Sequence, residues 1–260
     1  MSGPGRPPPS TSDTHYHHDV SNPTAAVLLI GDELLSGRTR DENAHHLAGE
    51  LTRHGIDLRE VRVVADDQPA IVSAVDALRK AYDHVFTSGG IGPTHDDITA
   101  DAIADAFGVP VEVHPEAERR VRDFCRLRGV DYNADQQRMA RIPVGATLIE
   151  NPLSAAPGFS LANVHVMAGV PTIFREMVAI ILPGLSHGRP VVAEEYRIWR
   201  GEGTIAHELR TIAEENGDVS VGSYPSVIDG RRGTTIVVRG TDPGRVAAVR
   251  DQVAARIPAE

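Results

Sequence analysis

The amino-acid sequence predicts an α/β fold with a three-layer, mostly parallel sheet, followed by a small α+β subdomain. Short apolar segments alternate with segments whose apolar residues recur at helical spacing. Such alternation produces right-handed crossovers and a sheet with helices on both faces. Beyond residue 190 the order changes to strand, helix, two strands and helix, which is typical of a small α+β unit.

The first part of the chain shows the alternation clearly. Ala25–Ile30 is a continuous apolar run, as in a buried parallel strand. Gly55 and Gly108 stand where two helices should end. The segments that we expect next are a helix over 41–54, a strand over 58–64, a helix over 69–82, a strand over 84–87 and a helix over 99–107.

The remaining elements follow from the same periodicity. We expect helices over 115–128, 134–140 and 171–182, strands over 146–149 and 165–167, and, after a linker over 186–190, a strand over 192–199, a helix over 204–216, strands over 219–224 and 234–239 and a helix over 243–257. Residues 1–23 are rich in Pro, Gly, Ser and Thr and predict a disordered tail. The predicted domains are therefore 24–185 and 191–257.

Composition narrows the possible partners and the compartment. The net charge of −10 disfavours a nucleic-acid partner and an anionic membrane surface, since both attract surplus Lys and Arg. The single cysteine, Cys125, has no disulfide partner in the chain, as expected in a reducing compartment. No apolar run approaches the roughly 20 residues that span a bilayer. We expect a cytoplasmic protein with a small-molecule ligand.

The most informative motif is a glycine-rich loop between a predicted strand and a predicted helix. Ser88–Asp97 contains Gly89, Gly90 and Gly92. Ligands of open α/β sheets bind at the carboxyl ends of strands, where this loop must lie. Glycines let the backbone approach a phosphate closely, and the helix start adds N–H groups and a positive dipole end. The loop is predicted to bind a phosphorylated ligand, with Thr94 as a further hydroxyl donor.

Two adjacent carboxylates, Asp96 and Asp97, distinguish this loop from a simple tight turn, which is the alternative interpretation. Beside a phosphate they would repel it by about 1 kcal/mol per pair in water. A divalent cation such as Mg²⁺ on Asp96 or Asp97 would remove this conflict by bridging to phosphate oxygens. A carboxylate could instead act as a base, and Asp96 could cap the following helix. Both residues are candidate metal ligands and candidate catalytic residues.

A second polar cluster follows the first predicted strand. It contains Asp32, Asp41 and Asn43, and it should lie along the same sheet edge because it too follows a buried strand. Asp32 and Asp41 could face the ligand, and the Asn43 amide offers both a donor and an acceptor. Capping of the following helix is an equally good role for Asp41.

Other segments carry weaker signals. Residues 151–158 form a loop of mostly small residues that would suit a lid over a flat ligand, or a turn with no further role. His45 and His46 lie on a predicted helix, where the positions four residues on, Gly49 and Glu50, include no second histidine or cysteine for a metal. The histidines of the tail do not make a preorganised metal site.

Several motifs together resemble one family. They are Gly31–Gly37, Asp41–Ala44, Thr87–Asp97, Asn151–Pro152 with Ala156–Phe159, and Gly169–Pro171. In this order they resemble the N-terminal domain of CinA-type proteins, which belongs with the molybdopterin-binding domains of the MoaB, Mog and gephyrin type. The resemblance covers residues 25 to about 185. Gly222–Pro225 is similar to a segment of the corresponding domain of eukaryotic FAD synthases.

The resemblance implies a molybdopterin-binding-like fold whose ligand loop lies where the residues alone place it. In the molybdenum-cofactor members this loop and the first loop bind the pterin, and an acidic residue supports Mg²⁺-dependent adenylyl transfer. Asp97 matches that acidic residue, and Asp32 and Asp41 match the pair in the first loop. Pro157 and Gly158 match the family's small-residue loop. CinA-type relatives are associated with metal-dependent cleavage of nucleotide pyrophosphates such as ADP-ribose.

Two departures from the family pattern limit what can be carried over. Adenylyl-transferring members have Arg just before the key aspartate, whereas this chain has Asp96, which argues against adenylyl transfer. The chain also stops before the position of the C-terminal deamidase domain of full-length CinA, so deamidation is not expected. The relatives form dimers or trimers, which implies a homo-oligomer.

We therefore expect a protein that binds a phosphorylated pterin (molybdopterin) or a nucleotide at the glycine-rich loop together with Mg²⁺ or another divalent cation. A metal-dependent pyrophosphatase of the ADP-ribose type is the enzymatic alternative. A non-catalytic module that only senses its ligand is the third. The residues alone do not choose among them.

Overall fold

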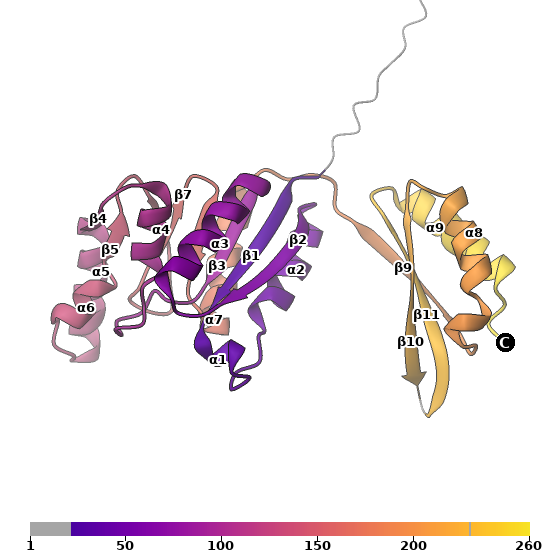
Figure 1. The fold of residues 1–260 in the computed structure, drawn as a ribbon, viewed down its shortest axis with the longest axis horizontal. Helices are drawn as coiled ribbons and strands as arrows, with labels where there is room; N and C mark the ends of the chain where they lie inside the picture. Colours follow the sequence, from indigo (N-terminus) through magenta and orange to yellow (C-terminus); the bar gives the residue numbers. More distant parts are fainter. Residues whose placement is uncertain (1–21, 229) are drawn as a thin grey trace, which may run out of the picture.

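The computed structural model describes residues 22–228 and 230–260 (Figure 1). The disordered tail predicted over 1–23 therefore lies, apart from its last two residues, outside the described residues. No helix in the described ranges is long and apolar enough to cross a membrane. Both predicted units contain helices and strands, and each has its own sheet and its own apolar core.

The main sheet has six strands in the order β2-β1-β3-β8-β7-β6. Neighbours among β2, β1, β3 and β8 are parallel, while β7 and β6 extend the sheet as antiparallel strands. This mostly parallel sheet confirms the predicted fold class. The strands are β1 (Thr24–Ile30), β2 (Asp57–Val64), β3 (His84–Ser88), β6 (Thr147–Ile149), β7 (Gly158–Leu161) and β8 (Val164–Met167).

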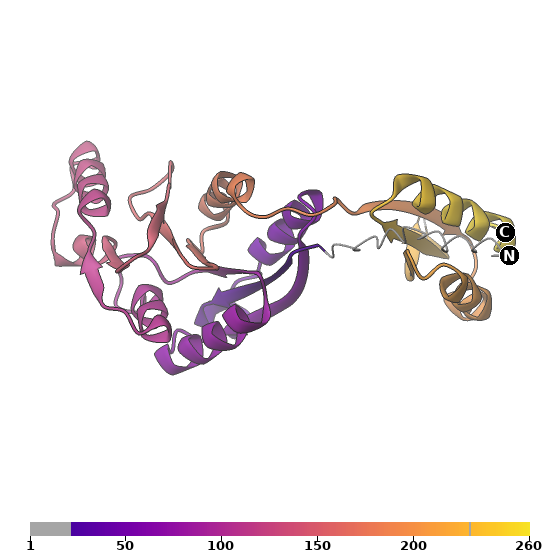
Figure 2. The ribbon, with the colours of Figure 1, turned by 90° about the horizontal axis from the view of Figure 1, so that it is seen from above.

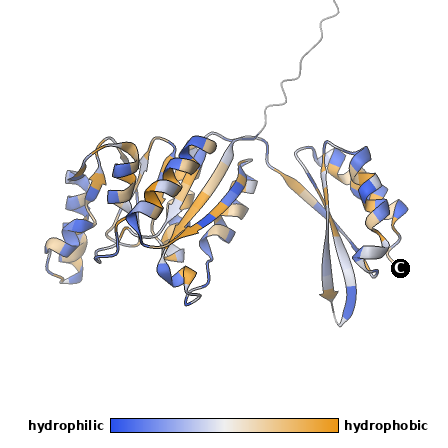
Figure 3. Ribbon diagram, in the orientation of Figure 1, coloured by the Kyte–Doolittle hydropathy of each residue, from blue (hydrophilic) through white to orange (hydrophobic). Residues whose placement is uncertain are grey.

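Helices cover both faces of the main sheet (Figure 2). Ala26 and Leu28 of β1 pack with α3 and α4, and Val27 and Leu29 pack with α2 and α7 on the opposite face. Alternate side chains of a strand point to opposite faces, so a run buried on both sides is continuously apolar. Figure 3 shows these hydrophobic strands between helices with hydrophilic outer faces. The helices are α2 (Asn43–Arg53), α3 (Gln68–Ala81), α4 (Thr99–Phe107) and α7 (Pro171–Ile181).

A smaller layer extends the first unit beyond α4. Two helices and a two-stranded antiparallel sheet form it: β4 (Val111–Val113), α5 (Pro115–Arg128), α6 (Ala134–Arg138) and β5 (Arg141–Pro143). Cys125 is buried here, on the inner face of α5. The unit ends with the short 3-10 helix η1 (Leu182–Gly184).

The second unit has a three-stranded antiparallel sheet in the order β10-β11-β9. Its elements are β9 (Val192–Ile198), η2 (Glu202–Thr204), α8 (Ala206–Glu215), β10 (Ser220–Ile228), β11 (Arg231–Gly240) and α9 (Pro243–Arg256). Buried residues such as Ile212, Ile236 and Val249 form a core that is separate from the two clusters of the main sheet. The predicted strand–helix–strand–strand–helix order is present.

Six short elements were not predicted: α1 (Asp32–Leu35), β4, β5, β7 and the 3-10 helices η1 and η2. Each has only three or four residues, too few to show a periodicity. Short strands of this kind are defined by their partner strands, since β7 pairs on both sides with β6 and β8. The order of the main sheet brings the carboxyl ends of β1, β3 and β8 together, because Leu29 is in register with Ser88 and Ser88 with Met167.

Candidate ligand-binding site

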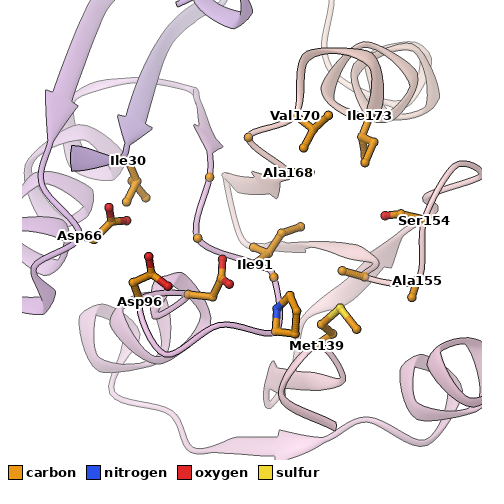
Figure 4. A pocket seen from close by; sticks show the side chains of 18 of the residues that line it. Ile30, Asp66, Ile91, Asp96, Met139, Ser154, Ala155, Ala168, Val170 and Ile173 are labelled. Atoms are coloured by element: carbon orange, nitrogen blue, oxygen red, sulfur yellow. The ribbon is translucent and has the colours of Figure 1, made fainter. Parts of the chain in front are cut away.

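A cavity of about 610 Å³ opens at this sheet edge (Figure 4). Its floor is the glycine-rich loop after β3 and the ends of β1 and β8. One wall is acidic and contains Glu33, Asp66, Asp96 and Asp97. The opposite wall is mostly apolar and includes a few polar side chains. Cavities of this volume are typical of small-molecule sites in proteins. Asp66, Asp96 and Ile30 lie together in Figure 4, opposite Met139 and Ser154.

The geometry of the loop requires glycine at two positions. Gly89 and Gly90 have φ angles of 113° and 70°, in the region that L side chains rarely adopt. A side chain on Gly89 would collide with the carbonyl oxygen of Ile30, and one on Gly90 with the hydroxyl of Thr99. That hydroxyl donates to the Gly89 carbonyl at 2.9 Å, and the Thr99 amide donates to the Gly90 carbonyl at 3.1 Å. The loop is therefore fastened to the first turn of α4.

The loop amides differ in their availability to a ligand. The Gly89 amide donates to the carbonyl of Met167 at 3.1 Å, as part of the link between β3 and β8. We had expected this amide among the phosphate donors, and its hydrogen bond is already made. The amides of Gly90 and Gly92 have no acceptor in the part of the chain that the structure describes. The expectation that the loop binds an anion therefore rests on the amides of Gly90 and Gly92.

The Asp97 carboxylate is held by its own loop. One of its oxygens accepts from the amide of Thr94 at 2.8 Å and from the Thr94 hydroxyl at 2.5 Å. The same oxygen lies so close to Gly92 that an added Cβ would stand 2.6 Å away. Thr94 therefore orients Asp97 and does not itself line the cavity. The second oxygen of Asp97 has no partner in residues 22–228 and 230–260.

Asp96 and Asp66 complete the acidic wall. Asp96 is not a helix cap, because Ile98 holds the N-cap position of α4 and no side chain accepts a capping hydrogen bond from the helix start. The Asp96 side chain is 58% exposed and borders the cavity. Burial raises the pKa of Asp66 above its ordinary value, and the negative charges of Glu33, Asp32 and Asp96 raise it further, while a hydrogen bond from the Asp32 amide opposes the rise.

These carboxylates could bind a divalent cation only if a ligand's phosphate and water supplied its remaining ligands. A group of three or more His, Cys, Asp or Glu side chains close enough to hold a metal does not occur in the described chain. Mg²⁺ is commonly bound through one or two carboxylates, with phosphate oxygens of the substrate and water as its other ligands. Burial is the main cause of the raised pKa of Asp66, and a cation would relieve the further rise that the charges of Glu33, Asp32 and Asp96 cause. One or two of the carboxylates of Asp66, Asp96 and Asp97 could hold such an ion together with phosphate oxygens and water.

The opposite wall contains residues that sequence reasoning did not single out. It is lined by Phe124 from α5, Gln136 from α6, Met139 at the end of α6, Ile173 from α7, and Ile91. Apolar surfaces with one amide suit a flat heteroaromatic ring that stacks and donates or accepts at its edge. No motif marks these residues, because α5 and α6 reach the cavity only through the tertiary fold. For Asp66 a signal existed, since it closely follows the end of β2 at the same sheet edge.

Asp41 and Asn43 support the loops. The Asp41 carboxylate accepts from the amides of Asn43 and Ala44 at 3.0 and 3.2 Å, which is the capping role considered for it. Asn43 is 5% exposed and donates to the Ser88 hydroxyl and to the Gly169 carbonyl, both at 2.8 Å. The start of α2 is thereby tied to the ends of β3 and β8. Both residues also line a small hollow of about 60 Å³ that borders the main cavity.

The other predicted site residues lie around the cavity. The exposed Asp32 begins α1, and its amide donates to Asp66 at 2.9 Å. Pro157 lines a neighbouring hollow of about 270 Å³. Gly158 begins β7 and leaves no space for a side chain, because a Cβ would collide with the Val166 carbonyl. The loop before it contributes Ser154 and two alanines to the cavity.

The fold is an α/β domain with a cavity at the carboxyl ends of its parallel strands, which is where domains of this class hold their ligands. The chain belongs to the family described as "probable molybdopterin binding domain", which matches residues 26–187. Residues 190–260 match a second family, described as "FAD synthase, middle domain". These matches confirm the resemblance that the motifs indicated.

Individual relatives agree with the family assignment. A protein of Metallosphaera sedula is 33% identical over 248 residues, covering 91% of this chain and 93% of that protein. A CinA-like protein of Salinibacter ruber is 32% identical over 231 residues, which are 85% of this chain and 56% of the relative. The solved structure of CinA from Thermoplasma acidophilum matches with a TM-score of 0.58 and 31% identity, covering 63% of this chain and 98% of that one.

Proposed function

We propose that the cavity binds a phosphorylated pterin or a nucleotide, with its phosphate on the glycine-rich loop and its ring against the apolar wall. The observation that carries this proposal is the pairing of two unlike surfaces in one cavity. The amides of Gly90 and Gly92 and the start of α4 favour an anion. Phe124 and Met139 favour a flat ring at the other side of the same space.

Mg²⁺ or a similar cation belongs to this proposal as a partner of the phosphate. Asp97 is positioned by Thr94, and Asp66 and Asp96 are its acidic neighbours. When bound, the ion would neutralise the phosphate and the carboxylates at once. Because the protein offers few ligands, we expect the metal to bind weakly alone and strongly with the phosphate.

Calorimetric titration of ADP and of a phosphorylated pterin, each with and without Mg²⁺, tests the proposal. We expect binding that Mg²⁺ strengthens, and loss of that strengthening in Asp97→Asn. Asp135→Asn is the matched control, since Asp135 is an exposed residue at the start of α6 outside the cavity lining. A ligand at 100 times its Kd should raise stability by about 2.7 kcal/mol. Absence of binding by both ligands would refute the proposal.

Hydrolysis of a nucleotide pyrophosphate is the second candidate function. One observation favours it: Asp66 is half-buried in the cavity wall and its pKa is raised, as suits a general base. With ADP-ribose, the addition of water across the pyrophosphate bond gives AMP and ribose 5-phosphate. We expect AMP release to require a divalent cation and to disappear in Asp66→Asn. If the protein binds ADP-ribose but does not hydrolyse it, we would conclude that it is a non-catalytic ligand-binding module.

We also propose a homo-oligomer. β2 is an edge strand of the main sheet, and Val61 and Val63 on it are 50% and 38% exposed. An edge strand with exposed apolar side chains favours contact with a second chain. Light scattering should give a dimeric or trimeric mass for the native chain and a smaller mass for Val61→Lys.

A further inference from the structure

Another hollow, of about 550 Å³, lies away from the glycine-rich loop, between α2 and α7. We propose that it binds the phosphate groups of a small phosphate-bearing molecule. Arg40, Arg53 and Arg175 line it together with His45 and His46, and we call it the basic hollow. It shares no lining residue with the main cavity, and binding in the basic hollow is told apart from binding in the main cavity by the signals of His46 and by the Gly49 variant, both outside the main cavity.

Arginines are concentrated in the basic hollow although the net charge of the chain is −10. The lining holds three arginines and two carboxylates, those of Asp41 and Glu42, and a third carboxylate, Glu50, pairs with Arg53 from outside the lining. Glu42 is paired with Arg175 at 2.9 Å, and the Asp41 carboxylate accepts from backbone amides. Arg40 has no ion-pair partner in the described part of the chain. A cation without a partner is thus available for an anion.

His46 lies in the lining of the basic hollow, where its titration is sensitive to nearby charge. Its pKa is lowered from the ordinary value, first by burial and then by the positive charges of Arg175, Arg53 and His45, while Glu50 opposes the shift. Glu50 is itself paired with Arg53 at 2.5 Å. A bound anion would reverse the repulsion and raise the pKa of His46.

Gly49 supplies an independent geometric argument. Glycine weakens a helix interior, and Gly49 lies in the middle of α2 without a left-handed backbone angle. Packing does not require it either, because an added Cβ would meet only the Arg53 guanidinium nitrogens, at 3.8 and 3.9 Å. What glycine does provide is open space at the floor of the basic hollow.

The side chains indicate the class of ligand. Guanidinium groups present paired N–H donors that match phosphate oxygens, and several of them together suit a di- or triphosphate. The lining contains no Phe, Tyr, Trp or large aliphatic side chain that would hold a base or a lipid tail. Inorganic pyrophosphate is therefore the minimal probe, and ADP tests whether a nucleoside adds affinity.

NMR titration of the full chain with pyrophosphate locates binding through the ring signals of His46. We expect a saturable shift, a rise in the pKa of His46, and binding about tenfold weaker in Arg40→Ala, the loss of one charge-assisted contact. Arg38→Ala is the matched control, since Arg38 is exposed and lies outside the lining. Equal weakening in both variants, or an unchanged His46, would overturn the proposal.

Gly49→Leu keeps the test decisive if the arginine variants fold poorly. Leucine favours the helix and fills the floor of the basic hollow, so melting temperature should not fall while pyrophosphate affinity drops at least about tenfold. Unchanged affinity in this variant refutes the site. If ADP and pyrophosphate bind equally, the site reads phosphate alone, and if ADP binds more tightly, a nucleotide is its ligand; both results support the proposal.

Discussion

Asn43 offers the sharpest test of how the candidate site is assembled. Its amide nitrogen donates two hydrogen bonds of 2.8 Å, to the Ser88 hydroxyl and the Gly169 carbonyl, from a side chain that is 5% exposed. Asn43→Ala removes both bonds and leaves these two acceptors without their donor. At about 1 kcal/mol for the bond to the exposed Gly169 and 1–3 kcal/mol for the buried Ser88 hydroxyl left without its donor, the expected loss is roughly 2–4 kcal/mol.

Urea unfolding measures this loss, and calorimetry of ADP with Mg²⁺ measures its effect on the site. Asn163→Ala is the matched control, because Asn163 also donates two bonds, to the carbonyls of Arg79 and Tyr82 at 3.0 and 2.9 Å, but lies outside the cavity lining. Both variants should lose stability, and only Asn43→Ala should lose affinity, by tenfold or more. Equal affinities in the two variants would show that Asn43 does not position the binding loops.

Three further predictions concern single groups. Gly90→Ala should cost more stability in chemical unfolding than Gly129→Ala, by about 1–3 kcal/mol, because both glycines have left-handed φ angles of 70° and 65° but only Gly90 has no room for a Cβ. Burial, with repulsion from a neighbouring histidine, lowers the pKa of His165 to about 4. The unfolded chain therefore binds this proton first, and stability should fall by roughly 3 kcal/mol as pH drops from about 6.5 to about 4, a slope that His165→Phe should flatten. Asp66→Asn should raise the melting temperature at neutral pH, since it removes a carboxylate whose pKa is raised by burial and repulsion, and this gain should shrink in acid as Asp66 becomes protonated in the parent.

The predicted elements that proved accurate are those whose patterns repeat over several turns or alternate strictly. Residues 99–107 and 115–128 were expected as helices with these bounds, and α4 and α5 occupy them. The glycine-rich loop was also placed correctly between a strand and a helix, because Gly89 and Gly90 are needed for a backbone that other residues cannot adopt. The periodicity of the helices and the glycines of the loop are both signals that depend only on residues close together in the sequence.

The composition of the cavity wall could not be predicted in the same way. Asp66, Phe124 and Met139 are distant in sequence and reach one space through the sheet order and the position of α5 and α6. The sequence also could not show which polar groups already have a hydrogen-bond partner within the protein, as the Gly89 amide and the Asn43 side chain do. Local sequence determined the strands, helices and the strained loop of this protein. Only the tertiary structure decided which side chains share a cavity, because hydrogen bonds and burial arise between segments far apart in the chain.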